Sequence, residues 1–111
     1  MTVNEMLQNS TVFTCLNPDA LSNQNIKGVF IGDLLSWVMG NGDEGQLWVT
    51  VQGHLNVAAV AVLKEFSGIV LCHGAVCAPE CLVKATEENI PVIVTELSAY
   101  ECAQHFVQLG L

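Results

Sequence analysis

The sequence contains no arginine, and its only basic residues apart from histidine are Lys27, Lys64 and Lys84. Eleven acidic residues give a formal net charge of -8. Binding to nucleic acids and to anionic membrane surfaces depends on clusters of basic side chains. We therefore expect no nucleic acid and no membrane among the partners of this chain.

The absence of arginine also restricts phosphate chemistry. No guanidinium group is present to hold a phosphate with two parallel hydrogen bonds, and no GxxxxGK[ST] phosphate loop occurs. A GxSxG nucleophile elbow is missing too. Cys72 and His73 are neighbours on an expected strand, where they point to opposite faces and do not form a nucleophile and base. We expect a protein that is not an enzyme and needs no cofactor.

Long hydrophobic runs are lacking as well. The longest, residues 57–63, has seven residues, whereas a membrane-spanning helix needs about 20. Residues 1–10 are polar and show neither the basic nor the apolar region of a signal peptide. The five cysteines are odd in number, so we expect reduced thiols and a cytoplasmic protein.

The composition is rich in core-forming residues. Of 111 residues, 51% are hydrophobic and 13% are charged, which predicts one domain over residues 1–111. Thr2 with Glu5, and Ser98 with Glu101, have the spacing of helix capping boxes. Strands are expected within residues 11–15 and at 28–31, 47–51, 69–72 and 92–95, and further helices at 34–39, 56–66, 79–88 and from Ser98 to about Leu109.

This alternation of strands and helices is typical of βαβ units. It predicts an α/β domain of three layers, with a mostly parallel sheet between two layers of helices. Ligands of such sheets bind outside the carboxyl ends of the strands, where helix N-termini offer unpaired N–H groups. The expected strand ends therefore indicate where to look for a site.

Polar or glycine-rich residues follow three of these strands. The candidate ligand-binding residues are Asp33, Gln52, His54, Asn56 and Gly74. Their carboxylate, amide and imidazole groups suit a small polar ligand, and glycine lets a ligand approach the backbone. The alternative interpretation makes Asp33 and Asn56 helix N-caps and His54 an ordinary loop residue.

A second constellation contains sulfur ligands. Cys77 and Cys81 are four residues apart, and Cys72 and His73 end the preceding strand. Three or four such ligands meeting at one turn would form a metal or iron–sulfur site. The spacing matches no known knuckle or ferredoxin pattern, so buried thiols are the alternative, and redox sensing is another.

The chain resembles the DRTGG domain family over nearly its whole length. The resemblance is carried by MTV at 1–3 with Glu5, GVFIGDLLS at 28–36 with Val38 and Met39, GQLWVTVQ at 45–52 with His54, Asn56 and AAVA at 58–61, GIVL at 68–71, Gly74, Pro79, Ala85 and IPVI at 90–93. The literal string Asp-Arg-Thr-Gly-Gly is absent. The pattern is also similar to the N-terminal domains of HPr kinase and the Mur ligases.

This resemblance implies a DRTGG or HPr kinase N-terminal domain-like fold. It also implies a non-catalytic regulatory or small-ligand-sensing role, carried out as a homodimer with a small polar ligand or nucleotide. The main alternative is a hydrogenase-associated metal or iron–sulfur accessory protein using Cys72, Cys77 and Cys81. A purely structural dimer with an empty crevice is a third possibility.

Overall fold

The computed structural model describes residues 1–111 and is built around one five-stranded sheet. The strand order is β1-β5-β4-β3-β2. The strands are β1 (Thr14–Cys15), β2 (Val29–Ile31), β3 (Leu47–Thr50), β4 (Gly68–Leu71) and β5 (Val92–Val94). Strands β2 to β5 are parallel to one another, and β1 pairs antiparallel with β5.

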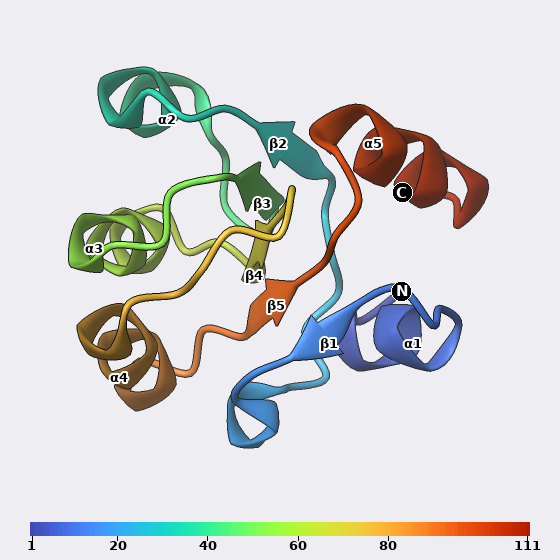
Figure 1. Ribbon diagram of the computed structural model, residues 1–111, viewed down its shortest axis with the longest axis horizontal. Coiled ribbons are helices and arrows are strands. Elements are labelled where there is room, and N and C mark those ends of the chain that lie inside the picture. The colour runs from blue at the N-terminus through green and yellow to red at the C-terminus, as the bar shows by residue number, and fades with distance from the viewer.

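Helices cover both faces of the sheet (Figure 1). Because β2, β3, β4 and β5 follow one another in order and crossovers are right-handed, their connecting helices lie on one face. These are α2 (Leu35–Asn41), α3 (Leu55–Leu63) and α4 (Pro79–Glu87). The opposite face carries α1 (Val3–Gln8) and α5 (Ala99–Gln108), so the predicted three-layer fold is confirmed.

Both predicted capping boxes form. The Thr2 hydroxyl accepts a hydrogen bond from the Glu5 backbone N–H at 3.1 Å, and the Glu5 carboxylate accepts one from the Thr2 N–H. Ser98 and Glu101 make the same reciprocal pair at the start of α5. Each box satisfies two backbone donors that a helix N-terminus otherwise leaves unpaired.

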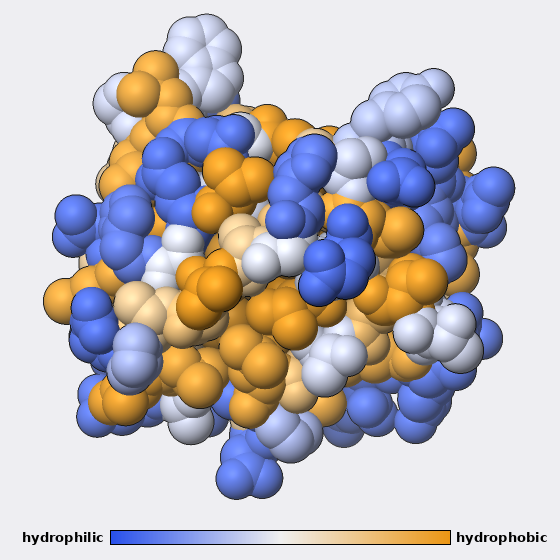
Figure 2. Space-filling model, in the orientation of Figure 1, coloured by the Kyte–Doolittle hydropathy of each residue, from blue (hydrophilic) through white to orange (hydrophobic).

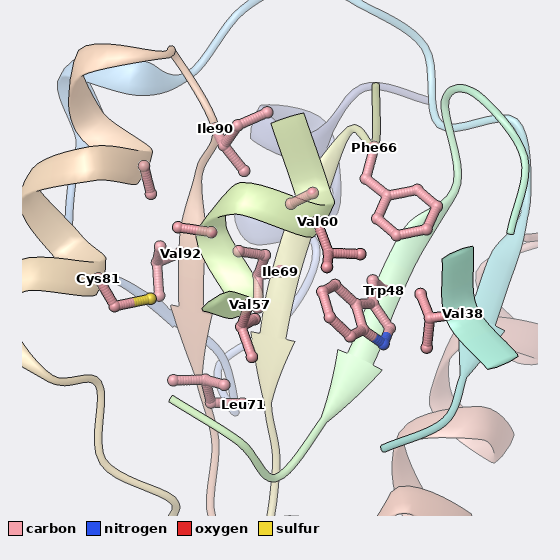
Figure 3. Close-up of a cluster of buried hydrophobic side chains, with 13 residues drawn as sticks. Val38, Trp48, Val57, Val60, Phe66, Ile69, Leu71, Cys81, Ile90 and Val92 are labelled. Atoms are coloured by element: carbon pink, nitrogen blue, oxygen red, sulfur yellow. The ribbon is translucent and has the colours of Figure 1, made fainter. Parts of the chain in front are cut away.

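The core between the sheet and α2, α3 and α4 contains the largest buried side chain, Trp48 (Figure 3). Its ring packs against Phe66, with 5.5 Å between ring centroids. The indole N–H donates to the backbone oxygen of Gly32 at 2.9 Å. That hydrogen bond satisfies the one polar atom of the indole and ties the end of β2 to β3.

A second core lies between the sheet and α1 and α5. Phe13 and Phe106 stack there with their ring centroids 5.2 Å apart, and Met6 is fully buried beside them. Central strand β4 is buried along its whole length because a core covers each of its faces. No helix of the fold has the length and apolarity needed to cross a bilayer.

Asn17 holds the antiparallel edge of the sheet in place. Its buried side chain accepts a hydrogen bond from the Val92 N–H at 2.7 Å and donates to the Ile90 carbonyl at 2.9 Å. The η1 turn (Pro18–Ala20) follows directly and packs against α4. This single side chain therefore connects the N-terminal segment to the start of β5.

Candidate functional site

The four parallel strands end at a common edge, which we call the strand-exit edge. It is formed by residues 32–34, 51–54, 72–78 and 95–98, which follow β2, β3, β4 and β5. All five candidate ligand-binding residues lie at or next to this edge, but in two separate groups. Asp33, Gln52, His54 and Asn56 follow β2 and β3, whereas Gly74 follows β4.

Asp33 connects the ends of β2 and β3. Its Oδ1 atom accepts hydrogen bonds from the Thr50 hydroxyl at 2.8 Å and from the Val51 N–H at 2.9 Å. The N-cap of α2 is Leu34, without a side-chain hydrogen bond. The interpretation of Asp33 as an N-cap is therefore wrong, because its carboxylate points to the neighbouring strand.

The β3 exit presents three polar side chains. His54 Nε2 lies 3.1 Å from Oε1 of Gln52, so the two side chains form a pair at the protein surface. His54 is the N-cap of α3 and makes no capping hydrogen bond. Asn56 lies inside α3 and is exposed, so its interpretation as an N-cap is also wrong.

The chain itself fills the space behind these residues. The Ala78 N–H donates to the Gly53 carbonyl at 2.7 Å, and a Cβ on Gly53 would overlap the Val76 carbonyl oxygen. Residues 76–78 are therefore packed directly on the β3 exit. Asp33, Gln52, His54 and Asn56 form a polar surface and line no cavity.

Gly74 lies in the wall of an open groove of about 390 Å³. The groove runs between the β1 segment, the end of β5 and the β4–α4 loop, and it is lined by Val12, Thr14, Leu16, residues 74–77 and residues 94–96. Gly74 has φ +69°, and a Cβ there would lie 2.6 Å from the Glu96 carboxylate. Sequence analysis missed Thr14, Thr95 and Glu96. Thr95 and Glu96 follow β5, the parallel neighbour of β4, and the Gly74 N–H donates to the Thr95 carbonyl at 3.0 Å. Thr14 reaches the groove because β1 pairs antiparallel with β5.

His73 joins the end of β4 to the start of α5. Its backbone is left-handed, with φ +57°, and its N–H donates to the Leu97 carbonyl at 2.7 Å. Its Nε2 atom accepts from the Ala99 N–H at 3.2 Å. His73 therefore satisfies a first-turn donor of α5, and its lone pair is engaged there.

The structure overturns the hypothesis of a metal site at Cys72, Cys77 and Cys81. Cys72 belongs to the core beneath α1 and α5, whereas Cys77 and Cys81 pack in the core beneath α2, α3 and α4. The sheet separates the two groups, and no three His, Cys, Asp or Glu side chains meet in a metal-binding cluster. The chain passes from one face to the other after β4: Cys72 directs its side chain toward α1 and α5, whereas Cys81 belongs to α4 on the opposite face.

All five cysteines are free thiols. Burial, together with a smaller contribution from the neighbouring Cys81, raises the pKa of Cys77 to about 12. Burial likewise raises the pKa of Cys102 to about 12, with Cys72 nearby. These thiols are protonated at neutral pH and are poor nucleophiles, since the thiolate is the reactive form.

The arrangement defines a class of fold: a mostly parallel α/β sheet between two helical layers, with polar groups at its strand-exit edge. The fold is also found in a solved structure from Clostridium perfringens that contains the CBS and DRTGG domains of the regulatory region of a pyrophosphatase, in complex with its activator diadenosine tetraphosphate. The two chains superpose with a TM-score of 0.71 at 17% sequence identity, over 96% of this chain. The predicted resemblance to DRTGG domains is confirmed at the level of fold.

The match spans less than half of the other protein's chain, 46% of its length. No protein-family model matches the sequence, and no curated protein matches it. The similarity to a regulatory region of an enzyme thus concerns the shape of the domain.

Proposed function

We propose that this protein is a non-catalytic regulatory domain that binds a small polar ligand at its strand-exit edge and works as a homodimer. The observation that carries the proposal is that four polar side chains follow β2 and β3 at the same edge of the sheet: Asp33, Gln52, His54 and Asn56. The protein also resembles, in fold, the regulatory region of a pyrophosphatase that is bound to a nucleotide activator, and this supports a regulatory role.

The free hydrogen-bonding groups of these side chains indicate which class of ligand would bind. Asp33 uses Oδ1 for both of its internal hydrogen bonds, which leaves Oδ2 to accept from a ligand. Asn56 offers both a donor and an acceptor, and His54 adds an imidazole. A nucleoside or nucleotide fits this set through its base and ribose, which carry several donors and acceptors.

The same groups argue against an enzyme. His54 is paired with an amide that cannot take part in proton transfer, and the most perturbed thiols are held protonated. Binding energy at this edge is available to favour one arrangement of the dimer over another, as regulation requires.

Thermal melting with adenosine, AMP and diadenosine tetraphosphate tests the proposal. A ligand at 100 times its Kd stabilises the folded state by about 2.7 kcal/mol, which raises Tm by several degrees. The shift should be lost in His54→Ala and in Asn56→Ala. It should persist in Gln104→Ala, which truncates an exposed amide on α5, away from this edge.

If none of these ligands shifts the Tm of the wild-type protein, the nucleotide assignment fails. A shift that survives both His54→Ala and Asn56→Ala would place the ligand elsewhere and remove the strand-exit edge from the proposal.

A further inference from the structure

Several large hydrophobic side chains are exposed around β2 and α2. Trp37 is 61% exposed, although Trp48 is completely buried. Leu34 and Ile31 precede Trp37 by three and six residues, and both are exposed. Figure 2 shows hydrophobic residues at the upper-left margin of the molecule, over α2, apart from those in the middle of the view. Large hydrophobic side chains that cluster at the surface mark a site of interaction.

We call the exposed side of β2 and α2, residues 28–42, the β2–α2 face. It is almost free of charge, although the whole chain carries -8. The one ionisable side chain among residues 28–42 is Asp33, which is hydrogen-bonded to β3. From outside this range, Lys64 Nζ donates to the Met39 carbonyl at 3.0 Å, at the end of α2. Like-charged chains repel one another in water, so a second copy approaches most easily where this charge is missing.

The β2–α2 face also ends the sheet. Strand β2 pairs only with β3, so its other edge has no strand beside it. Hydrogen bonds to β3 are made by the Gly28 carbonyl and the Gly32 N–H, at the even-numbered positions. Backbone groups alternate in direction along a strand, so Val29 and Ile31 direct theirs to the open edge.

We propose that this face is the interface of the homodimer, in which β2 of one copy pairs antiparallel with β2 of a second copy. The inference rests on the proposed function, which requires a dimer, and names its contact surface. A two-fold axis at Phe30 places Val29 of each copy opposite Ile31 of the other and joins the two sheets into one of ten strands.

The helical layers continue across the same axis. Helix α2 lies next to β2 at the outer margin of its layer (Figure 1), so the two copies of α2 meet and cover Trp37 and Leu34. A stable interface buries about 800 Å² on each partner. A three-residue strand falls short of this area, and α2 must therefore contribute to the contact.

The self-association of three variants tests the interface. Trp37→Glu and Ile31→Glu each put a charge into the interface, and each should raise the dimer dissociation constant about 30-fold or more, as for a hot-spot residue. Val83→Glu is the matched control, because Val83 is 57% exposed on α4, at the other end of the helical layer. Sedimentation equilibrium measures the constant, and circular dichroism checks that each variant is folded.

Hydrogen exchange provides a readout that does not depend on variants. In the wild-type protein, the amides of Val29 and Ile31 should exchange more slowly as the concentration rises through the dissociation constant. This measurement decides the matter if the charged variants fail to fold.

The outcomes separate the two proposals. A wild-type dimer that Trp37→Glu and Ile31→Glu leave intact, with no added protection at Val29 and Ile31, overturns this interface but keeps the dimeric function. A wild-type monomer at all concentrations removes the dimer from both proposals, while ligand binding at His54 and Asn56 is still tested by the melting experiment.

Discussion

Gly53 and Val76 are in direct backbone contact, although they belong to the exits of two different strands. The Gly53 carbonyl accepts a hydrogen bond from Ala78, and the Val76 carbonyl oxygen occupies the space in which any side chain at position 53 would begin. This contact seals the β3 exit against the β4 exit. It turns the expected crevice into a polar surface and leaves the open groove at Gly74 instead.

Replacing Gly53 with alanine should therefore destabilise the protein. The new Cβ meets backbone atoms that cannot rotate away, and overpacking of this kind costs about 1 to 3 kcal/mol. Gly40→Ala is the control, because Gly40 lies in α2 with no atom within 4 Å of the added Cβ. That variant should gain roughly 0.5 to 1 kcal/mol, since alanine favours a helix. Urea unfolding measures both changes. If Gly53→Ala and Gly40→Ala change the unfolding free energy equally, the backbone contact between Gly53 and Val76 is not as tight as described.

Gly74→Ala tests the groove wall. Its left-handed backbone costs an alanine about 1 kcal/mol, and the contact with the Glu96 carboxylate adds to this. Gly110 has φ +86° with no atom near its added Cβ, so Gly110→Ala measures the backbone part alone. Gly74→Ala should be the more destabilising of the two. Adding Glu96→Ala should recover the difference, as measured by a double-mutant cycle in thermal unfolding.

Asn17→Ala should weaken the antiparallel edge of the sheet. It leaves the Val92 N–H and the Ile90 carbonyl without their buried partner, and each unsatisfied group costs about 1 to 3 kcal/mol. We expect a loss of about 3 kcal/mol in the free energy of unfolding. Asn23→Ala, at an exposed position in the same segment, should change stability by less than about 0.5 kcal/mol. A small effect of Asn17→Ala would mean that water replaces its hydrogen bonds.

Stability should fall at alkaline pH. The pKa of Cys77 and Cys102 is raised from 9.0 to about 12, so the folded state keeps protons that the unfolded state releases. The contribution of these two thiols to the unfolding free energy is therefore complete below pH 9, and it is lost as the pH rises from 9 to 12. The double variant Cys77→Ala, Cys102→Ala should flatten this slope in urea titrations at several pH values. If the double variant shows the same decrease of unfolding free energy with pH as the wild type, other ionisable groups cause the loss of stability at alkaline pH.

Most elements of the fold were predictable from local patterns. The capping boxes at Thr2 and Ser98, Pro79 at the start of α4, and the apolar run of β4 each depend on neighbours within a few residues, and each forms as expected. The mostly parallel sheet follows from the alternation of these elements. The length and position of each element differ from the expectation by only a few residues, because helix and strand ends depend on tertiary contacts.

The candidate site was predicted less well, for a physical reason. Asp33 and Asn56 have the sequence positions of N-caps, but a hydrogen bond to Thr50 directs the first to another strand and the second lies within α3. Cys72 and Cys81 are close in sequence and lie on opposite faces of the sheet.

By itself, the sequence determined the class of fold, the absence of a basic surface and the polar residues that follow the strands, because these depend on composition and short-range order. Only the tertiary structure decided which of those residues meet, that the thiols are separated, and that Trp37 is left exposed on α2, beside the open edge of β2. Contacts between residues distant in sequence arise from the packing of the layers, which no local pattern specifies.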